Sequence, residues 1–175
     1  HCRDCTTCVK SGECVLQELA HRLGVHNIRF QNTREQYEID DSSPSLIRDP
    51  NKCILCGLCV RVCDEVMGVG ALGLVKRGFD TVVKPNMEKP LAESGCESCG
   101  QCVSVCPVGA LQERLTIQKE VPLETEVTET TCAYCSVGCS LELESYGDML
   151  IKANPDKQGT VNAGLACGKG KWGFD

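Results

Sequence analysis

The sequence predicts an α+β protein that is stabilised by metal rather than by a large apolar core. Its 175 residues include 16 cysteines but only three Phe, three Tyr and one Trp, too few large side chains for an ordinary core. The cysteines fall into three groups, and one internal spacing occurs twice. Regular spacing is typical of metal ligands rather than of a secreted disulfide scaffold. We therefore expect three metal-binding modules and a reducing compartment, the cytoplasm.

The central group is an internal repeat. Its halves read Cys53-Ile-Leu-Cys56-Gly-Leu-Cys59-Val-Arg-Val-Cys63 and Cys96-Glu-Ser-Cys99-Gly-Gln-Cys102-Val-Ser-Val-Cys106-Pro107. Three thiolates at steps of three can hold one face of an iron–sulfur cube, and in two-cluster ferredoxins the fourth cysteine of each half binds the other cluster. We therefore expect two 4Fe-4S clusters with crossed ligands: Cys53, Cys56, Cys59 and Cys106 on one, and Cys96, Cys99, Cys102 and Cys63 on the other.

The residues around these ligands repeat as well. Gly57 and Gly100 are equivalent, and we expect the backbone to pass close to the cluster at both. Two zinc sites are the alternative, but zinc normally takes pairs of cysteines rather than closely spaced triplets. The remaining matches are the triplets Gly70-Ala71-Leu72 and Gly109-Ala110-Leu111 and the apolar residues Val60, Val62, Val103 and Val105.

The first group lies at the beginning of the chain. Cys5, Cys8 and Cys14 supply three thiolates, and Cys14 directly precedes a predicted helix with apolar residues at positions 15, 16, 19, 20 and 23. Gly24 is suited to end this helix. Either His1 or Cys2 can be the fourth ligand, and the geometry barely separates the two. An imidazole ligand would raise the reduction potential of the cluster, as in Rieske centres.

The last group reads Cys132-Ala-Tyr-Cys135-Ser-Val-Gly-Cys139 and continues, after 27 residues, with Cys167. Residues 141–143 alternate, Tyr146-Gly147-Asp148 predicts a turn, and residues 149–151 return. Such a hairpin brings Cys167 back to the first three cysteines. The four thiolates predict another metal site, for which zinc is a stronger competitor than in the central repeat because the spacing is looser.

The stretches between the groups carry weaker signals. Val75–Val83 predicts a short hairpin in which Phe79 packs, and Pro107 predicts the start of a short helix that ends at Leu115. The expected organisation is a His/Cys3 module at 1–30, a loop at 31–52, a two-cluster domain at 53–115, a linker at 116–130 and a small β-hairpin cluster domain at 131–175.

The first group resembles the histidine-ligated cluster module of respiratory complex I, complex iron-only hydrogenases and NAD-linked formate dehydrogenases. The resemblance rests on the spacing of His1, Cys5, Cys8 and Cys14 and on the helix that follows. It implies that His1 is the fourth ligand and that Cys2 is a spare thiol.

The last group, with Asn162-x-Gly164-x-x-Cys167-x-Lys169-Gly170, closely resembles the N-terminal cluster domain of molybdenum and tungsten bis-pterin oxidoreductases, formate dehydrogenases above all. The resemblance implies a 4Fe-4S cluster on Cys132, Cys135, Cys139 and Cys167. It also implies that Lys169 lies between cluster and pterin and assists electron passage; the alternative is an ordinary solvated lysine. The family's pterin-binding body does not occur in this sequence, so no residue is assigned to substrate.

Taken in order over all 175 residues, the modules resemble the alpha subunit of an NAD(P)-linked formate dehydrogenase. The resemblance implies four 4Fe-4S clusters that relay electrons between a molybdenum or tungsten bis-pterin and a partner subunit that binds flavin and NAD(P). Further iron–sulfur subunits and ferredoxin are the other implied partners. Both ends of the chain read as cuts in a longer polypeptide, which would add an upstream 2Fe-2S domain and a downstream catalytic body.

Two related functions and one unrelated class are alternatives. Complex iron-only hydrogenases share the first two modules but not the last motif, and the large subunit of complex I resembles a single-cluster version of the middle module. A zinc or disulfide scaffold for protein interaction is the different class. The net charge of −6 with scattered basic residues argues against a nucleic-acid partner. No apolar run approaches the roughly 20 residues that a membrane span requires.

Overall fold

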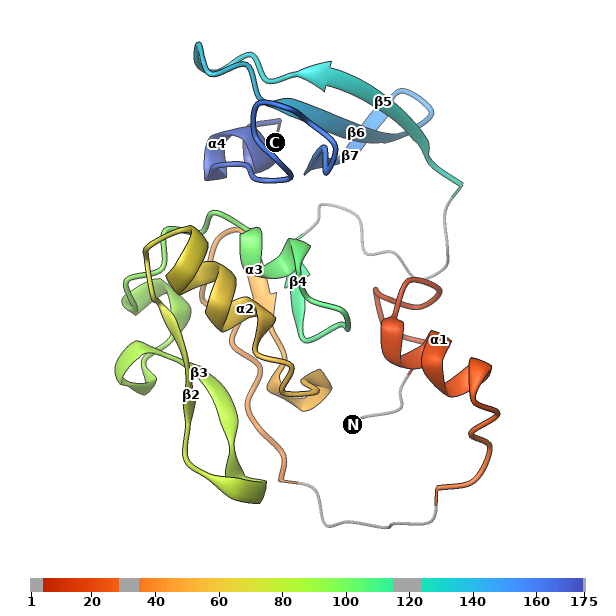
Figure 1. Ribbon diagram of the computed structural model, residues 1–175, viewed down its shortest axis with the longest axis vertical. Coiled ribbons are helices and arrows are strands. Elements are labelled where there is room, and N and C mark those ends of the chain that lie inside the picture. Colours follow the sequence, from red (N-terminus) through yellow and green to blue (C-terminus); the bar gives the residue numbers. More distant parts are fainter. Residues whose placement is uncertain (1–4, 29–34, 115–123, 175) are drawn as a thin grey trace.

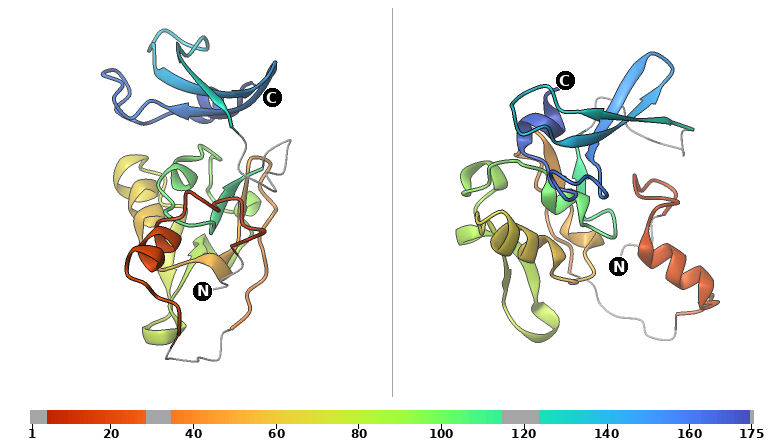
Figure 2. Two further views of the ribbon diagram at one scale, coloured as in Figure 1. Left: turned by 90° about the vertical axis from the view of Figure 1, so that its right-hand side faces the viewer. Right: turned by 45° about the horizontal axis from the view of Figure 1, so that its top comes forward.

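The computed structural model describes residues 5–28, 35–114 and 124–174. Figure 1 shows a central region of short strands and helices, with α1 on one side of it and a three-stranded sheet at one end. The two further views show the same arrangement, with α4 on the side of the sheet that faces the central region (Figure 2). The three cysteine groups thus correspond to three neighbouring parts of the molecule.

The regular elements are short. The helices are α1 (Val15–Arg22), α2 (Leu58–Arg61), α3 (Gln101–Ser104) and α4 (Gly168–Trp172). The strands are β1 (Leu46–Arg48), β2 (Leu72–Val75), β3 (Val82–Pro85), β4 (Leu111–Glu113), β5 (Glu126–Thr131), β6 (Ser140–Tyr146) and β7 (Met149–Pro155). They form three antiparallel sheets with the orders β1-β4, β2-β3 and β5-β6-β7.

The two halves of the central repeat share one local backbone conformation. Leu55 and Ser98 both adopt the left-handed region, with φ of 58° and 51°. Gly57 and Gly100 directly precede α2 and α3 with φ of 75° and 77°. A Cβ atom disfavours this region, so glycine is needed at both positions for its backbone conformation.

The halves differ after the fourth cysteine. Cys63 lies in a π-helical turn, Val62–Val66, that continues α2. The N–H groups of Val69 and Gly70 both donate to the carbonyl of Cys63, at 2.9 and 3.1 Å. This wider turn accommodates the extra residues that the first half carries.

A small core lies between the two halves, and cysteines are part of it. Cys53, Cys96, Cys102 and Cys106 pack, partly buried, against its buried members. The predicted metal ligands therefore occupy positions that larger apolar side chains hold in ordinary domains. The buried members are Leu46, Cys59, Leu72, Val83, Leu91, Val103 and Leu111.

The predicted first helix is confirmed as α1, and Gly24 follows its end in the left-handed region. None of the residues of α1 is buried. The N–H of Val15 donates to the carbonyl of Pro107 at 3.0 Å, which connects the start of α1 to the turn after Cys106.

Two expectations for the central region are wrong, and both errors have one cause. Residues 107–110 form turns instead of a helix and lead into β4, while the expected loop at 31–52 contains β1. Leu111 pairs with Arg48, and Leu46 and Leu111 are both buried in the core. Each strand has only three residues, too few for an alternating pattern, so only the pairing with its distant partner defines it.

The hairpin expected at 75–83 is present. Its strands β2 and β3 pair antiparallel, and the loop between them is longer than expected. Phe79 lies in this loop and is fully exposed. The expectation that Phe79 packs is therefore wrong, because the loop projects its side chain away from the core.

The turn at 146–148 is confirmed, and β6 pairs with β7 across it. The expected hairpin is, however, a three-stranded sheet. Its additional strand β5 begins at Glu126, within the stretch expected to be a linker, and all of its residues are exposed. An exposed strand shows no apolar alternation, which explains why the sequence did not predict it. Among the described residues, no helix is long and apolar enough to cross a membrane.

Candidate metal centres

The first candidate centre combines cysteines from both halves of the repeat. Cys53, Cys56, Cys59 and Cys106 line one cavity, together with Arg48 and apolar atoms of Ile54, Val83, Val108, Ala110 and Leu111. Cys106 belongs to the second half, whereas the other three cysteines belong to the first. The fold thus brings together the crossed set that the spacing predicted.

These thiols are in an environment that disfavours negative charge unless a metal is bound. Burial, and to a smaller extent the neighbouring Cys53, Cys106 and Cys56, raise the pKa of Cys59 to about 12. Burial likewise raises the pKa of Cys53, although the N–H of Leu55 donates to its Sγ at 3.4 Å. A bound metal centre would compensate the charge of these thiolates.

Arg48 is the cation at this centre. Its Nη1 donates to the carbonyl of Val83 at 3.0 Å, and its Nε lies 3.7 Å from Oδ2 of Asp40. Within the described part of the chain, this buried Nε has no hydrogen-bond partner. Burial lowers the pKa of Arg48, while Asp40, Cys53 and Cys59 counteract that effect. The guanidinium is thus placed to attract negative charge on this thiol set.

The second candidate centre combines three cysteines of the second half with one of the first. Burial raises the pKa of Cys102, and Cys96, Cys99, Cys59 and Cys63 raise it further, so Cys63 lies near the thiols of the second half. The N–H of Ser98 donates to Cys96 Sγ at 3.4 Å, as Leu55 does in the first half, and the N–H of Ala71 donates to Cys63 Sγ at 3.2 Å. Backbone donors to ligand sulfurs are a means of adjusting cluster potentials.

The third candidate centre lies at the α4 end of the β5–β7 sheet. Slight burial raises the pKa of Cys139, and Cys132, Cys135 and Cys167 contribute to the increase, so the hairpin does return Cys167 to the other three. Asn162 fastens the returning segment to β6. It exchanges hydrogen bonds with the N–H and C=O of Ser140, at 2.9 and 3.1 Å, and donates to the carbonyl of Leu165 at 2.8 Å.

The amino-terminal cysteines lie next to the central repeat. The N–H of Cys8 donates to the carbonyl of Cys5 at 3.4 Å, and Cys14 directly precedes α1. A Cβ on Gly109 would lie 2.6 Å from Cys8 Sγ, so this loop contacts the turn after Cys106. His1 and Cys2 lie outside the described residues, and His1 as fourth ligand stays a prediction. Lys169 is exposed in the first turn of α4, and its predicted role toward a pterin also stays a prediction.

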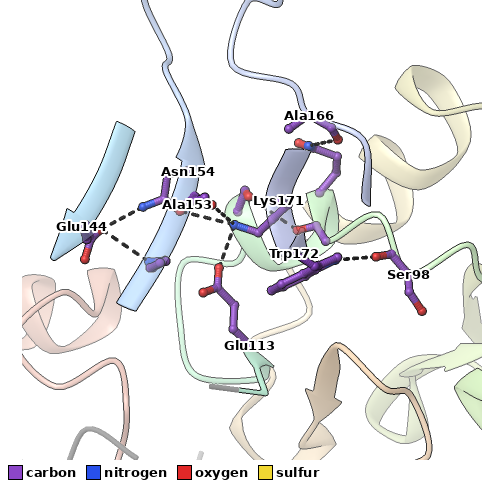
Figure 3. Close-up of polar contacts among 12 residues, drawn as sticks. Ser98, Glu113, Glu144, Ala153, Asn154, Ala166, Lys171 and Trp172 are labelled. Atoms are coloured by element: carbon purple, nitrogen blue, oxygen red, sulfur yellow. Dashed lines mark hydrogen bonds and ion pairs between the residues drawn. The ribbon is translucent and has the colours of Figure 1, made fainter. Parts of the chain in front are cut away.

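Sequence reasoning missed one polar cluster between the central region and the carboxy-terminal sheet. Lys171 of α4 is 1% exposed, and its Nζ lies 2.7 Å from Oε1 of Glu113 on β4. The indole N–H of Trp172 donates to the carbonyl of Ser98 at 2.6 Å. Figure 3 shows both contacts. The sequence offers no signal for the burial of a lysine in a Gly-Lys-Gly-Lys run.

The donor chemistry fits iron–sulfur clusters. None of the twelve cysteines from Cys53 to Cys167 is in a disulfide, and soft thiolates with backbone N–H donors are the ligands that such clusters take. Among the described residues, no group of three or more His, Cys, Asp or Glu side chains is close enough to hold a single metal ion. At the first centre, the four thiols lie around a cavity.

Three protein families match successive parts of the chain. Residues 1–29 match the NADH-ubiquinone oxidoreductase-G iron-sulfur binding region. Residues 43–112 match the ferredoxin-like domain of NADH-quinone oxidoreductase subunit 3. Residues 125–175 match the molybdopterin oxidoreductase Fe4S4 domain. The boundaries of these matches follow the three parts of the structure.

Individual relatives are of several kinds. A G-type subunit of an NADH-quinone oxidoreductase from Rhizobium meliloti is 38% identical over 177 residues, which cover 100% of this chain and 20% of the relative. A putative formate dehydrogenase of Staphylococcus aureus is 30% identical over 215 residues, 99% of this chain and 22% of the relative. A chain in the crystal structure of an NAD+-reducing [NiFe]-hydrogenase in the H2-reduced state superposes with a TM-score of 0.61 at 35% identity, over 69% of this chain and 51% of that chain. The chain spans about a fifth of the length of the curated relatives.

Proposed function

Because the chain carries the iron–sulfur domains of the family of NADH-quinone oxidoreductase G-type subunits and NAD(P)-linked molybdopterin oxidoreductases, we propose that it is an electron-relay segment of a multisubunit NAD(P)-linked oxidoreductase. The observation that carries this proposal is the gathering of Cys53, Cys56, Cys59 and Cys106, from two distant halves, around one cavity. When bound, 4Fe-4S clusters supply one-electron transfer. The proposed complement is four such clusters.

The protein's own residues would hold, shield and tune these groups. The apolar core around the central thiols excludes water, and the N–H groups of Leu55, Ser98 and Ala71 point at ligand sulfurs. Contacts also connect neighbouring sets: Gly109 lies against Cys8, and a Cβ on Gly168 would lie 3.9 Å from Cα of Cys99. This series of contacts supports an uninterrupted relay from the amino-terminal module to the carboxy-terminal sheet.

The relay proposal is tested by iron and acid-labile sulfide analysis of anaerobically purified protein. We expect about four irons and four sulfides per site. Stoichiometric zinc without sulfide would instead support the interaction scaffold. Substitution of Cys56 or Cys135 by Ser should reduce the iron content by about one cluster each, because each removes one ligand.

As the finer assignment, we propose that the complete protein is a formate dehydrogenase subunit. The match of residues 125–175 to a molybdopterin oxidoreductase domain and the 30% identical putative formate dehydrogenase support it. A flavin- and NAD(P)-binding subunit is the proposed partner. Formate should then reduce the clusters of the complete enzyme. Lys169→Ala should slow that reduction while the iron content stays unchanged, whereas Lys157→Ala, at another exposed lysine of the same module, should not.

A second candidate function is that of a G-type subunit in an NADH-quinone oxidoreductase. The 38% identity over the whole chain to such a subunit favours it. The two candidates differ in their electron donor. Reduction of the clusters by NADH but not by formate, in the complete complex, would favour the NADH-quinone oxidoreductase function.

A further inference from the structure

We infer that the buried Lys171–Glu113 ion pair positions the carboxy-terminal thiol set against the set of Cys96, Cys99, Cys102 and Cys63. Both residues are thus positioning residues for electron transfer between the two centres. This inference rests on the proposed relay function and adds to it the contact that sets one of its steps.

The ion pair is buried, and its ammonium group has a hydrogen-bond acceptor for each of its hydrogens. The side chains of Lys171 and Glu113 are 1% and 6% exposed, with 2.7 Å between Nζ and Oε1. The same Nζ donates to the carbonyl of Ala153 and to Oδ1 of Asn154, both at 3.3 Å. An ammonium group has three donor hydrogens, so these three acceptors satisfy it completely. The cation is consequently held in one place, between β4 and β7 (Figure 3).

The helix that carries Lys171 lies between the two thiol sets. On one side, a Cβ on Gly170 would lie 3.5 Å from Sγ of Cys132. On the other side, a Cβ on Gly168 would lie 3.5 Å from the carbonyl oxygen of Ser98, next to Cys99. A shift of α4 would therefore change the separation of the two sets directly.

Two further contacts tie α4 to the ligand loop of the central repeat. The indole of Trp172 donates to the carbonyl of Ser98 at 2.6 Å. The side-chain amide of Gln101, which is buried, donates to the carbonyl of Ala166 at 2.7 Å. Gln101 directly precedes Cys102, and Ala166 directly precedes Cys167. Both bonds thus act on residues adjacent to ligands.

The ion pair is the strongest determinant among these contacts. Removal of either partner would leave the other charge buried and unpaired, which costs far more than loss of a neutral hydrogen bond. The polar side chains around Lys171 are also anchored within the sheet, because Asn154 Nδ2 donates to Oε1 of Glu144 at 2.8 Å. The position of Lys171 is therefore transmitted to β6 and β7 as well as to α4.

The test uses the complete cluster-loaded protein with Lys171→Met, Glu113→Gln and the double variant. The matched control is Lys157→Met, because Lys157 is an exposed lysine of the same module. Electron paramagnetic resonance of the fully reduced protein measures the spin–spin interaction between the two clusters. We expect each single variant to weaken this interaction in part while iron and sulfide contents stay at the wild-type level. The double variant should lose no more than the single variants, because both act on one pair.

Lys171→Arg keeps the positive charge and should retain the spin–spin interaction. Weakening of the interaction in Lys171→Met but not in Lys171→Arg would show that the charge matters, and not merely a loss of stability at this position. Persistence of the interaction in both single variants, or additive losses in the double variant, would overturn the inference. Wild-type protein without iron and sulfide would instead overturn the proposed relay function, and this inference with it. Should Lys171→Met not fold, Glu113→Gln, which keeps the size of the side chain and removes its charge, should weaken the interaction; an unchanged interaction in it would also overturn the inference.

Discussion

Gly100 and Trp172 are in direct contact: a Cβ on Gly100 would lie 2.6 Å from Cζ2 of Trp172. Gly100 precedes α3 in the central repeat, and Trp172 is the last residue of α4. For Gly57, the equivalent residue in the first half, a Cβ would meet none of the described atoms within 4 Å. The carboxy-terminal module therefore covers one half of the repeat at a position where the other half is open.

This difference makes the two glycines a matched pair for mutation. Alanine at either position would carry the same strain from its positive φ, about 1–2 kcal/mol. Only Gly100→Ala also displaces Trp172 and the stem of Lys171, at a further cost of about 1–3 kcal/mol. Denaturant unfolding should show the larger loss for Gly100→Ala, together with a change in Trp172 fluorescence. Equal losses and unchanged fluorescence in both variants would contradict this packing.

Arg48 should raise the reduction potential of the centre formed by Cys53, Cys56, Cys59 and Cys106. Its cation lines their cavity, and a positive charge favours the more negative, reduced state. Arg48→Gln should lower the potential by an amount on the order of 60 mV, a tenfold change in a one-electron equilibrium. Redox titration followed by electron paramagnetic resonance measures it.

The control for this measurement is Arg61→Gln. Arg61 lies in the first half of the repeat, as Cys53, Cys56 and Cys59 do, but is exposed and paired with Glu65 at 3.2 Å. Its charge is screened by solvent, so its removal should leave the potential nearly unchanged. Shifts of similar size in both variants would show that net charge, and not the cavity position of Arg48, sets the potential.

Cluster binding should strengthen as pH rises. The pKa of the Cys59 thiol in the cluster-free protein is about 12, compared with 9.0 ordinarily, and the ligand must be a thiolate. Each pH unit below this pKa therefore adds about 1.4 kcal/mol to the cost of its deprotonation. At limiting iron and sulfide, cluster occupancy should rise between pH 7 and pH 9, with release of protons. Occupancy that is constant or falls over this range would speak against buried neutral thiols.

The cluster-free fold should show the opposite dependence. Because the folded-state pKa of Cys59 is raised, its neutral thiol contributes stability that is fully present below pH 9.0. This contribution is lost as pH rises through 9 toward 12. Denaturant midpoints of cluster-free protein should thus fall between pH 8 and pH 10, and Cys59→Ala should reduce that slope. An unchanged slope in the variant would show that another group is responsible.

Cys63→Ser should damage the cluster held mainly by Cys96, Cys99 and Cys102, because the crossed ligand comes from the other half. Its mirror variant, Cys106→Ser, should damage the cluster of Cys53, Cys56 and Cys59. Electron paramagnetic resonance of the two variants should show reciprocal losses of signal. Loss confined to the cluster of the half that carries the substitution would show that the ligands do not cross.

The amino-acid sequence alone determined the grouping of the cysteines and the local elements next to them. Cysteines at steps of three and the turn at 146–148 depend on neighbouring residues, so their spacing was sufficient. The helix after Cys14 was predicted for the same reason, since its apolar stripe is a local pattern.

Only the tertiary structure decided which distant segments are partners. The strands β1, with Leu46, and β4, with Leu111, are defined by their pairing with each other. Phe79 is exposed because its loop projects away from the core. Lys171 is buried because Glu113, 58 positions earlier, provides its counter-charge. Pairing, burial and charge compensation depend on what the fold places opposite a residue, and no local pattern encodes that.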